Sequence, residues 1–276
     1  MENGTTTLSF ENPPLKEVSL LVHFDAIPGF HAGMPGLLWR EMRSDYPSLE
    51  ELQPIVVDVE KFGVPPRTPH REFQLLQAAP APRILLVDTT GQWVIQFQPN
   101  LFAINWRRSD STNTTYPRFE AMKRRFFYEY NRFIDFLKQN DLGNPKLTQV
   151  EMTYVNHIPV GTLMPSDVFN DAFSSNRYDS NLQLEVYASN AKHIIRKGVD
   201  PVGRIYTSIG RAHKPSDGTD VYKLEFLTRT LVKGSGVSEI DERFDLMRSY
   251  VNSCFEKITT PLMHEKWLKK GGVKDE

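Results

Sequence analysis

The chain has 276 residues, of which 39% are hydrophobic and 24% are charged, as in an average soluble globular protein, so disorder is expected only at the ends. Its formal net charge of -1 excludes a global electrostatic attraction to nucleic acid or to an anionic membrane. The single cysteine, Cys254, excludes an intramolecular disulfide framework and a multi-thiolate zinc site.

The sequence contains no targeting or membrane-spanning signal. The N-terminal residues lack a basic region followed by an apolar run, and no stretch of about eighteen apolar residues occurs elsewhere. We therefore expect a cytoplasmic protein in a reducing compartment, without a membrane anchor.

The first half of the chain is predicted to be mainly β-structure that ends in a long helix. Alternating apolar residues predict strands at residues 17–24, 54–60, 83–88, 93–97 and 101–106, and a short amphipathic helix near residues 37–42. Pro117 opens the longest predicted helix, which runs to about residue 140, where Gly143 and Pro145 follow. The solvated side of this helix is expected to carry Lys123, Arg124, Arg125, Arg132 and Lys138.

The second half repeats this order of elements. Strands are predicted at residues 147–160, 182–188, 204–211 and 222–229, followed by a helix from about residue 239 to 258. Residues 166–181 are predicted to form an inter-strand loop, and Trp267 is expected to dock onto the body. Strands followed by a helix predict an α+β fold of antiparallel sheets covered by long helices, with two similar strands-then-helix halves as a hypothesis. The halves are residues 1–145 and 146–276, which can also pack as a single domain.

No familiar catalytic or cofactor-binding motif occurs. Gly-rich phosphate loops, His-Glu-x-x-His and Gly-x-Ser-x-Gly are all missing, and the seven histidines are scattered. We therefore predict neither a cofactor nor a metal. The best remaining donors for a metal site assembled from distant strands are His157, His213, Glu151 and Glu225.

The most distinctive cluster of residues ends one predicted strand and opens the long helix. Arginine beside aromatic rings suits a phosphate, a carboxylate or a nucleobase, because the guanidinium pairs with oxygens and stacks on rings. Alternatively, the aromatic residues close the end of the core and the arginines pair with local acids. The cluster comprises Asn105, Trp106, Arg107, Arg108, Tyr116, Pro117, Arg118, Phe119 and Glu120.

A second cluster lies on the strand predicted at residues 147–160. Its period of two places Glu151 and His157 on one face and Tyr154 and Asn156 on the other, so both faces carry polar groups. Buried polar groups need hydrogen-bond partners, and these residues therefore either form a structural network or line a cavity. Both alternatives stay open at this point.

These segments resemble, in order and spacing, a sporadically distributed family of uncharacterised prokaryotic proteins of about this length. The resemblance covers nearly the whole chain and rests on Pro14-Leu15, Glu17-Val18, Gln96-Phe97, Asn105-Trp106-Arg107, Tyr116-Pro117-Arg118-Phe119, Glu151, Tyr154, Asn156, Ile158, Phe255, Ile258-Thr259 and Trp267. It implies an accessory gene product, such as a component of a defence or toxin-antitoxin locus, and it implies no established activity.

The leading functional hypothesis is a non-enzymatic binding or regulatory protein that recognises a protein partner, a second copy of itself or a small anionic ligand. One alternative is a hydrolase or nucleotide-processing enzyme with a site built from Glu151, His157, Arg107 and Arg118 between the two halves. Another is a nucleic-acid-binding module on the long helix, which its interspersed acids disfavour. No catalytic residue is predicted, and the binding candidates are Trp106, Arg107, Arg108, Tyr116, Arg118, Glu151, Tyr154, Asn156 and His157.

Overall fold

The computed structural model describes residues 9–63, 81–109, 114–170, 184–214, 216–234 and 236–270. In these parts of the chain, nine strands form one antiparallel sheet. The first half supplies β2 (Leu15–Phe24), β3 (Ser48–Leu52), β4 (Arg83–Val87), β5 (Trp93–Gln98) and β6 (Leu101–Arg107), and the second half supplies β7 (Leu147–Pro159), β8 (Ser189–Lys197), β9 (Asp200–His213) and β10 (Asp220–Leu231). Their order across the sheet is β3-β4-β5-β6-β2-β7-β10-β9-β8.

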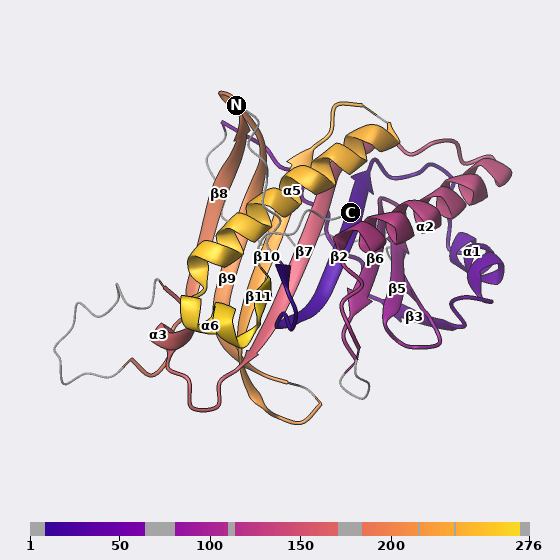
Figure 1. Cartoon of the computed structure of the whole chain (residues 1–276). Coiled ribbons are helices and arrows are strands. Elements are labelled where there is room, and N and C mark those ends of the chain that lie inside the picture. Colours follow the sequence, from indigo (N-terminus) through magenta and orange to yellow (C-terminus); the bar gives the residue numbers. More distant parts are fainter. Residues whose placement is uncertain are drawn as a thin grey trace, which may run out of the picture.

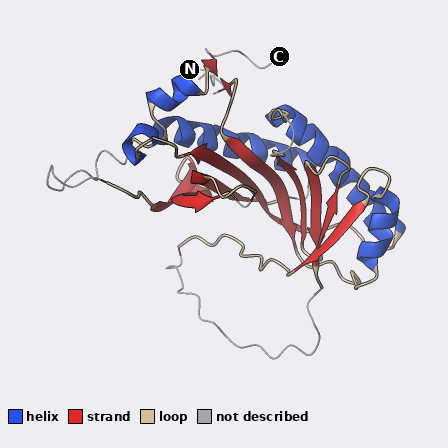
Figure 2. Cartoon of the chain, turned by 90° about the horizontal axis from the view of Figure 1, so that it is seen from below, coloured by secondary structure: helices blue, strands red, loops and turns tan. Residues whose placement is uncertain are grey.

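Helices lie along one face of this curved sheet (Figures 1 and 2). The helices in the described residues are α1 (Met34–Met42), α2 (Phe119–Gln139), α3 (Pro165–Val168), α5 (Val237–Ile258) and α6 (Pro261–Lys266). The two longest contact the middle of the sheet, α2 on β6 and β2, and α5 on β10 and β7. We call this side the helix-covered face and the other side the opposite face. None of the helices described combines the length and apolarity needed to span a membrane.

The predicted fold class of antiparallel sheets covered by long helices is wrong. The molecule is dominated by a single nine-stranded sheet, with 38% of residues in strands and 28% in helices. β2 pairs with β7 from Leu15 opposite Asn156 to Phe24 opposite Leu147, so strands from both halves join in one sheet. Alternation along each strand identifies the strands but carries no signal for pairing between distant ones, which is why the single sheet was not predicted. The boundary between residues 145 and 146 stays a prediction.

Two predicted strands are misplaced. Residues 54–60 have no regular structure, and the strand lies before them at β3. They cross the opposite face instead, where the Ile55 N–H donates to Gln98 (3.0 Å) and the Glu60 N–H donates to Gln149 (3.0 Å). The strand predicted at residues 182–188 is β8, which begins at Ser189; residues 182–183 and most of the predicted loop at 166–181 lie outside the described residues. β8 is an edge strand with mostly exposed side chains, so it lacks the apolar alternation that identifies a half-buried strand.

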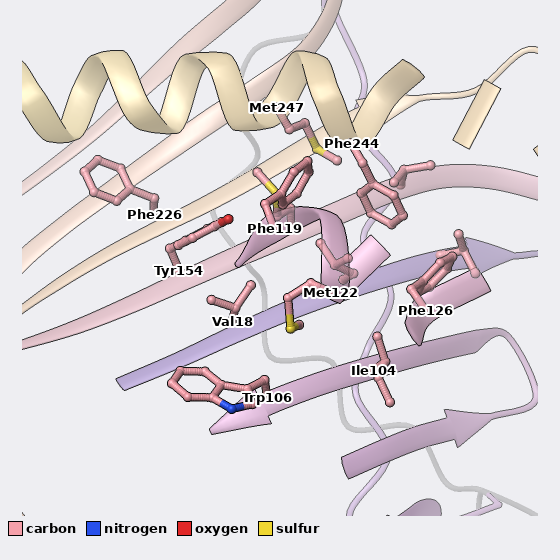
Figure 3. Close-up of a cluster of buried hydrophobic side chains, with 14 of the residues drawn as sticks. Val18, Ile104, Trp106, Phe119, Met122, Phe126, Tyr154, Phe226, Phe244 and Met247 are labelled. Atoms are coloured by element: carbon pink, nitrogen blue, oxygen red, sulfur yellow. The ribbon is translucent and has the colours of Figure 1, made fainter. Parts of the chain in front are cut away.

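The core lies between the sheet and the two long helices (Figure 3). Aromatic side chains of α2, such as Phe126, contact β6 on one side and α5 on the other, with ring centroids 6.0 Å from Phe102 and 5.0 Å from Phe244. Residues at three- and four-residue steps make this possible, because they share one face of a helix. The two helices are therefore fixed to each other and to the sheet.

One basic residue expected on the solvated side of α2 is buried. Lys123 is only 7% exposed, and its Nζ lies 2.9 Å from Asp241 and 2.6 Å from Asp245 of α5. Burying an ammonium group is costly unless it is paired, and the two carboxylates supply the pairing. Lys123 thus joins α2 to α5, a role that required knowing that the helices are neighbours.

Candidate functional site

Four of the nine predicted binding residues line one pocket on the helix-covered face. Tyr116, Arg118, Tyr154 and Asn156 meet there between β7, the start of α2 and one side of α5, around a cavity of about 70 Å³. Apolar side chains complete the wall, namely Leu15, Phe226, Val251 and Phe255. The second cluster of the sequence therefore lines a cavity through Tyr154 and Asn156, one of the two alternatives that its pattern left open.

Strand geometry places the residues of β7 in this pocket. Tyr154 and Asn156 are buried, and Tyr154 extends on the same side of the sheet as α5 (Figure 3). Asn156 lies two residues further along the strand and therefore points to the same face, because successive side chains of a strand alternate between faces. Asn156 Nδ2 donates to the Leu224 carbonyl (3.2 Å), which fixes the amide at the pocket wall. The Tyr154 hydroxyl lies 3.3 Å from that of Tyr116.

Arg248 of α5 is a central residue of the pocket that sequence reasoning missed. It shares one helix face with Val251 and Phe255, at spacings of three and seven residues. Its Nη1 donates to the Tyr154 hydroxyl (3.0 Å), and its guanidinium lies 4.5 Å from the centre of the Phe119 ring. The sequence signal for a role of Arg248 is its spacing from the apolar residues on the same helix face. A solvated position on the helix is the simpler interpretation of that spacing.

The Tyr116 hydroxyl beside Arg248 does not neutralise its charge. Burial raises the pKa of Tyr116 well above its ordinary value, with the neighbouring Tyr154 adding to the effect, so this phenol is uncharged near neutral pH. Burial on its own would lower the pKa of Arg248, but the two tyrosines outweigh it and the pKa is raised. Arg248 is therefore a cation that donates a hydrogen bond to Tyr154 and has no carboxylate partner among the described residues.

Arg118 is held in a strained backbone conformation at the mouth of the pocket. Its φ of 73° and ψ of 159° fall in a region that is populated almost only by glycine. Its Nη1 donates to Ser9 Oγ (3.2 Å) and to the Phe10 carbonyl (3.1 Å). Arg118 is the N-cap residue of α2 and lines the same pocket as Arg248.

The N-terminal segment covers this site. β1 (Ser9–Phe10) pairs with β11 (Lys269–Lys270) next to the pocket. The ring of Phe10 lies 5.6 Å from Phe255 and 5.7 Å from Trp267, the latter of which docks onto the body as expected. Contacts from the two ends of the described chain thus help to close the pocket.

Several other cations that the fold partly or fully buries have carboxylate partners. Arg229 lies 2.7 Å from Glu151, Arg125 lies 3.0 Å from Glu129, Arg204 pairs with Glu60, and Lys123 pairs with Asp241 and Asp245. Within the described parts of the chain, neither the partly buried Arg248 nor the exposed Arg118 has such a partner. Both arginines that line the pocket therefore lack a carboxylate partner among the described residues.

The remaining residues of the arginine-aromatic cluster lie around the pocket rather than in it. Trp106 is buried with its ring 5.3 Å from that of Tyr116, so it supports the pocket wall from behind. Arg107 does not line the pocket. Its Nε donates to the Gly91 carbonyl (2.8 Å), in the turn before β5. Arg108 lines a neighbouring polar cavity.

Glu151 and His157 lie on the opposite face, away from the pocket. Glu151 contacts Arg229 (2.7 Å) and His23 (3.2 Å). Burial alone would raise the pKa of Glu151, but the hydrogen bond with His23 and the charge of Arg229 outweigh it, and the pKa is lowered. His157 lies six residues further along β7, roughly 20 Å away for an extended strand. The residues proposed for an enzymatic site therefore do not converge with Arg118.

Comparisons with known proteins identify no relative. The sequence matches no family model, and no curated protein or solved structure is similar to the chain. The resemblance to a prokaryotic family stays a prediction, and the function has to be inferred from the pocket itself.

Proposed function

We propose that this chain is a non-enzymatic binding protein whose pocket takes a small anionic ligand. A carboxylate or phosphate group of the ligand binds between Arg248 and Arg118, and the attached apolar part contacts the hydrophobic wall. The proposal keeps the small anionic ligand of the sequence hypothesis and names the residues that hold it.

The observation that carries this proposal is a partly buried arginine that has no counter-charge. Removing a guanidinium from water is unfavourable unless an anion compensates it, and the fold supplies carboxylates to Arg229, Arg204 and Lys123. Among the described residues, Arg248 contacts tyrosine hydroxyl groups and pairs with no carboxylate. A bound anion would complete the pairing, and Arg118 would add a second cation on the other side.

The wall of the pocket indicates the chemical character of the rest of the ligand. Leu15, Phe226, Val251 and Phe255 give it a mainly apolar surface, as in typical small-molecule sites with a few convergent polar groups. The cavity of about 70 Å³ fits a small group. A short acyl or aryl acid, or its phosphate counterpart, matches both the charge and the size.

A titration with matched compounds tests the proposal. Benzoate and phenyl phosphate carry the two candidate anions on the same ring, and benzyl alcohol is the neutral control. Calorimetry or ligand-observed NMR should detect binding of an anion and weaker or no binding of the alcohol. The anion that binds more tightly identifies the preferred head group.

Two variants on α5 distinguish an effect on the binding site from a general effect on the helix. Arg248→Gln should lower the affinity at least about tenfold, because a hydrogen bond between charged groups contributes roughly 1.5–3 kcal/mol. Arg243→Gln is the matched control, because Arg243 lies on the same helix, pairs with Glu239 (3.1 Å) and does not line the pocket. Equal affinity for the alcohol and the acids, or equal effects of the two substitutions, would contradict the proposal.

A further inference from the structure

A second cavity adjoins the pocket. It has a volume of about 150 Å³ and shares Pro13, Tyr116 and Arg118 with the first one. Its lining is mostly polar, in contrast to the apolar wall beside Arg248. Arg118 therefore lies at the junction of two cavities of different character.

Arg108 is the cation of this side cavity. Its Nη2 donates to the Pro13 carbonyl (3.2 Å), while its Nε is buried and lacks a hydrogen-bond partner in the described structure. A buried donor that stays unpaired costs free energy, and an oxygen of a bound anion can satisfy it. The exposed carboxylate of Glu11 also lies in the lining, but it forms no ion pair with Arg108 or Arg118 within the described residues.

We infer that the ligand carries two anionic groups at the ends of a short chain. One group binds Arg248 inside the apolar pocket, and the other binds Arg108 in the side cavity, with Arg118 between them. This inference rests on the proposed function and extends it from a single anion to an elongated dianion. The chemical class is a dicarboxylate, or an acid that carries a phosphate at its far end.

The contrast between the two cavities favours this class over a ligand with one charged end. The side cavity offers an arginine, threonine side chains and the polar Asn12, so an apolar tail would lose water there without gaining a matching surface. A second anion gains a partly buried guanidinium instead. Arginine suits this role because its planar fork pairs with carboxylate and phosphate oxygens.

A series of acids of increasing length tests whether the side cavity binds a second anionic group. Dicarboxylates from succinate to suberate are compared, by calorimetry, with the monocarboxylates from butyrate to octanoate and with the half methyl esters of the same diacids. At one length the diacid should bind about tenfold more tightly than the monoacid and the half ester, because it adds one charge-assisted contact.

Neighbouring arginines supply the matched variants. Arg108→Gln should remove the tenfold gain and leave the affinity for the monoacid unchanged, whereas Arg107→Gln, on the other side of the strand end, should change neither. If the binding of monoacids depends on Arg248 but diacids bind no more tightly than half esters, the inference of a dianionic ligand is wrong and the proposed function stands. If no acid binds through Arg248, the proposed function fails as well. Should Arg108→Gln fail to fold, the comparison of diacid with half ester in the unmodified protein decides the question.

Discussion

Replacing Arg118 tests whether strain is held at the pocket mouth. The residue adopts φ 73° and ψ 159°, and a non-glycine residue in such a region costs about 1–3 kcal/mol. Arg118→Gly removes this strain, and Arg118→Ala keeps it. Both variants lose the same hydrogen bonds to Ser9 and Phe10, so these contacts cancel in the comparison.

The magnitude follows from two opposing effects. Relief of strain favours the glycine variant by about 1–3 kcal/mol, and the greater freedom of glycine in the unfolded chain disfavours it by about 0.4–1 kcal/mol. Arg118→Gly should therefore be more stable than Arg118→Ala by about 1.3 kcal/mol at the midpoints of the two ranges. Most substitutions of alanine by glycine have the opposite sign, which makes the result diagnostic.

Urea denaturation of the two variants, monitored by circular dichroism, measures the difference in the free energy of unfolding. Ligand titration of the same samples should show an equal loss of affinity, since both lack the guanidinium. Arg118→Lys keeps a positive charge and the strain, so it should recover part of the affinity without recovering stability. An alanine variant as stable as the glycine variant would refute the assignment of strain to Arg118.

Two further predictions concern the sheet. Gly203→Ala should lower the free energy of unfolding by about 2–3 kcal/mol, because the added Cβ would clash with the Arg229 carbonyl and lie 2.8 Å from Thr230 Cγ2. Gly210→Ala, on the same strand with no atom within 4 Å, should cost less than about 1 kcal/mol, and equal losses in urea denaturation would contradict the close packing. The lowered pKa of Glu151 means that folding stabilises its ionised form. This contribution to the free energy of unfolding is complete above the ordinary pKa of 4.5, and it is lost as the pH falls through the lower pKa of the folded state. Stability should therefore fall more steeply below pH 4.5 in the unmodified protein than in Glu151→Gln, and parallel pH curves from denaturation would exclude this role.

Much of the local structure could be predicted from the sequence. The alternation that marks Tyr154 and Asn156 as facing away from Glu151 is a property of any strand, and the structure has those orientations. Pro117 correctly indicated where the long helix begins, and α2 starts two residues later at Phe119. Tyr116 and Arg118 were candidates because of their residue types, and both line the pocket.

The rest depends on contacts between distant segments. Arg248 reaches Tyr154 only because α5 packs on β7 and β10, and nothing in the helix itself indicates that neighbour. Lys123 was assigned to solvent for the same reason, since its partners Asp241 and Asp245 are on the other long helix. Pairing across the sheet also explains the incorrect fold class, because the register of β2 on β7 is set by packing that involves both halves.

The most direct test of the account is a crystal structure of the protein with para-bromobenzoate, in which anomalous scattering from bromine locates the ring. We predict a carboxylate between Arg248 and Arg118, with the bromine against Phe226, Val251 or Phe255, and loss of this density in Arg248→Gln. Bromine density only outside this pocket, or density unchanged in the variant, would contradict the assignment of the pocket as an anion-binding site.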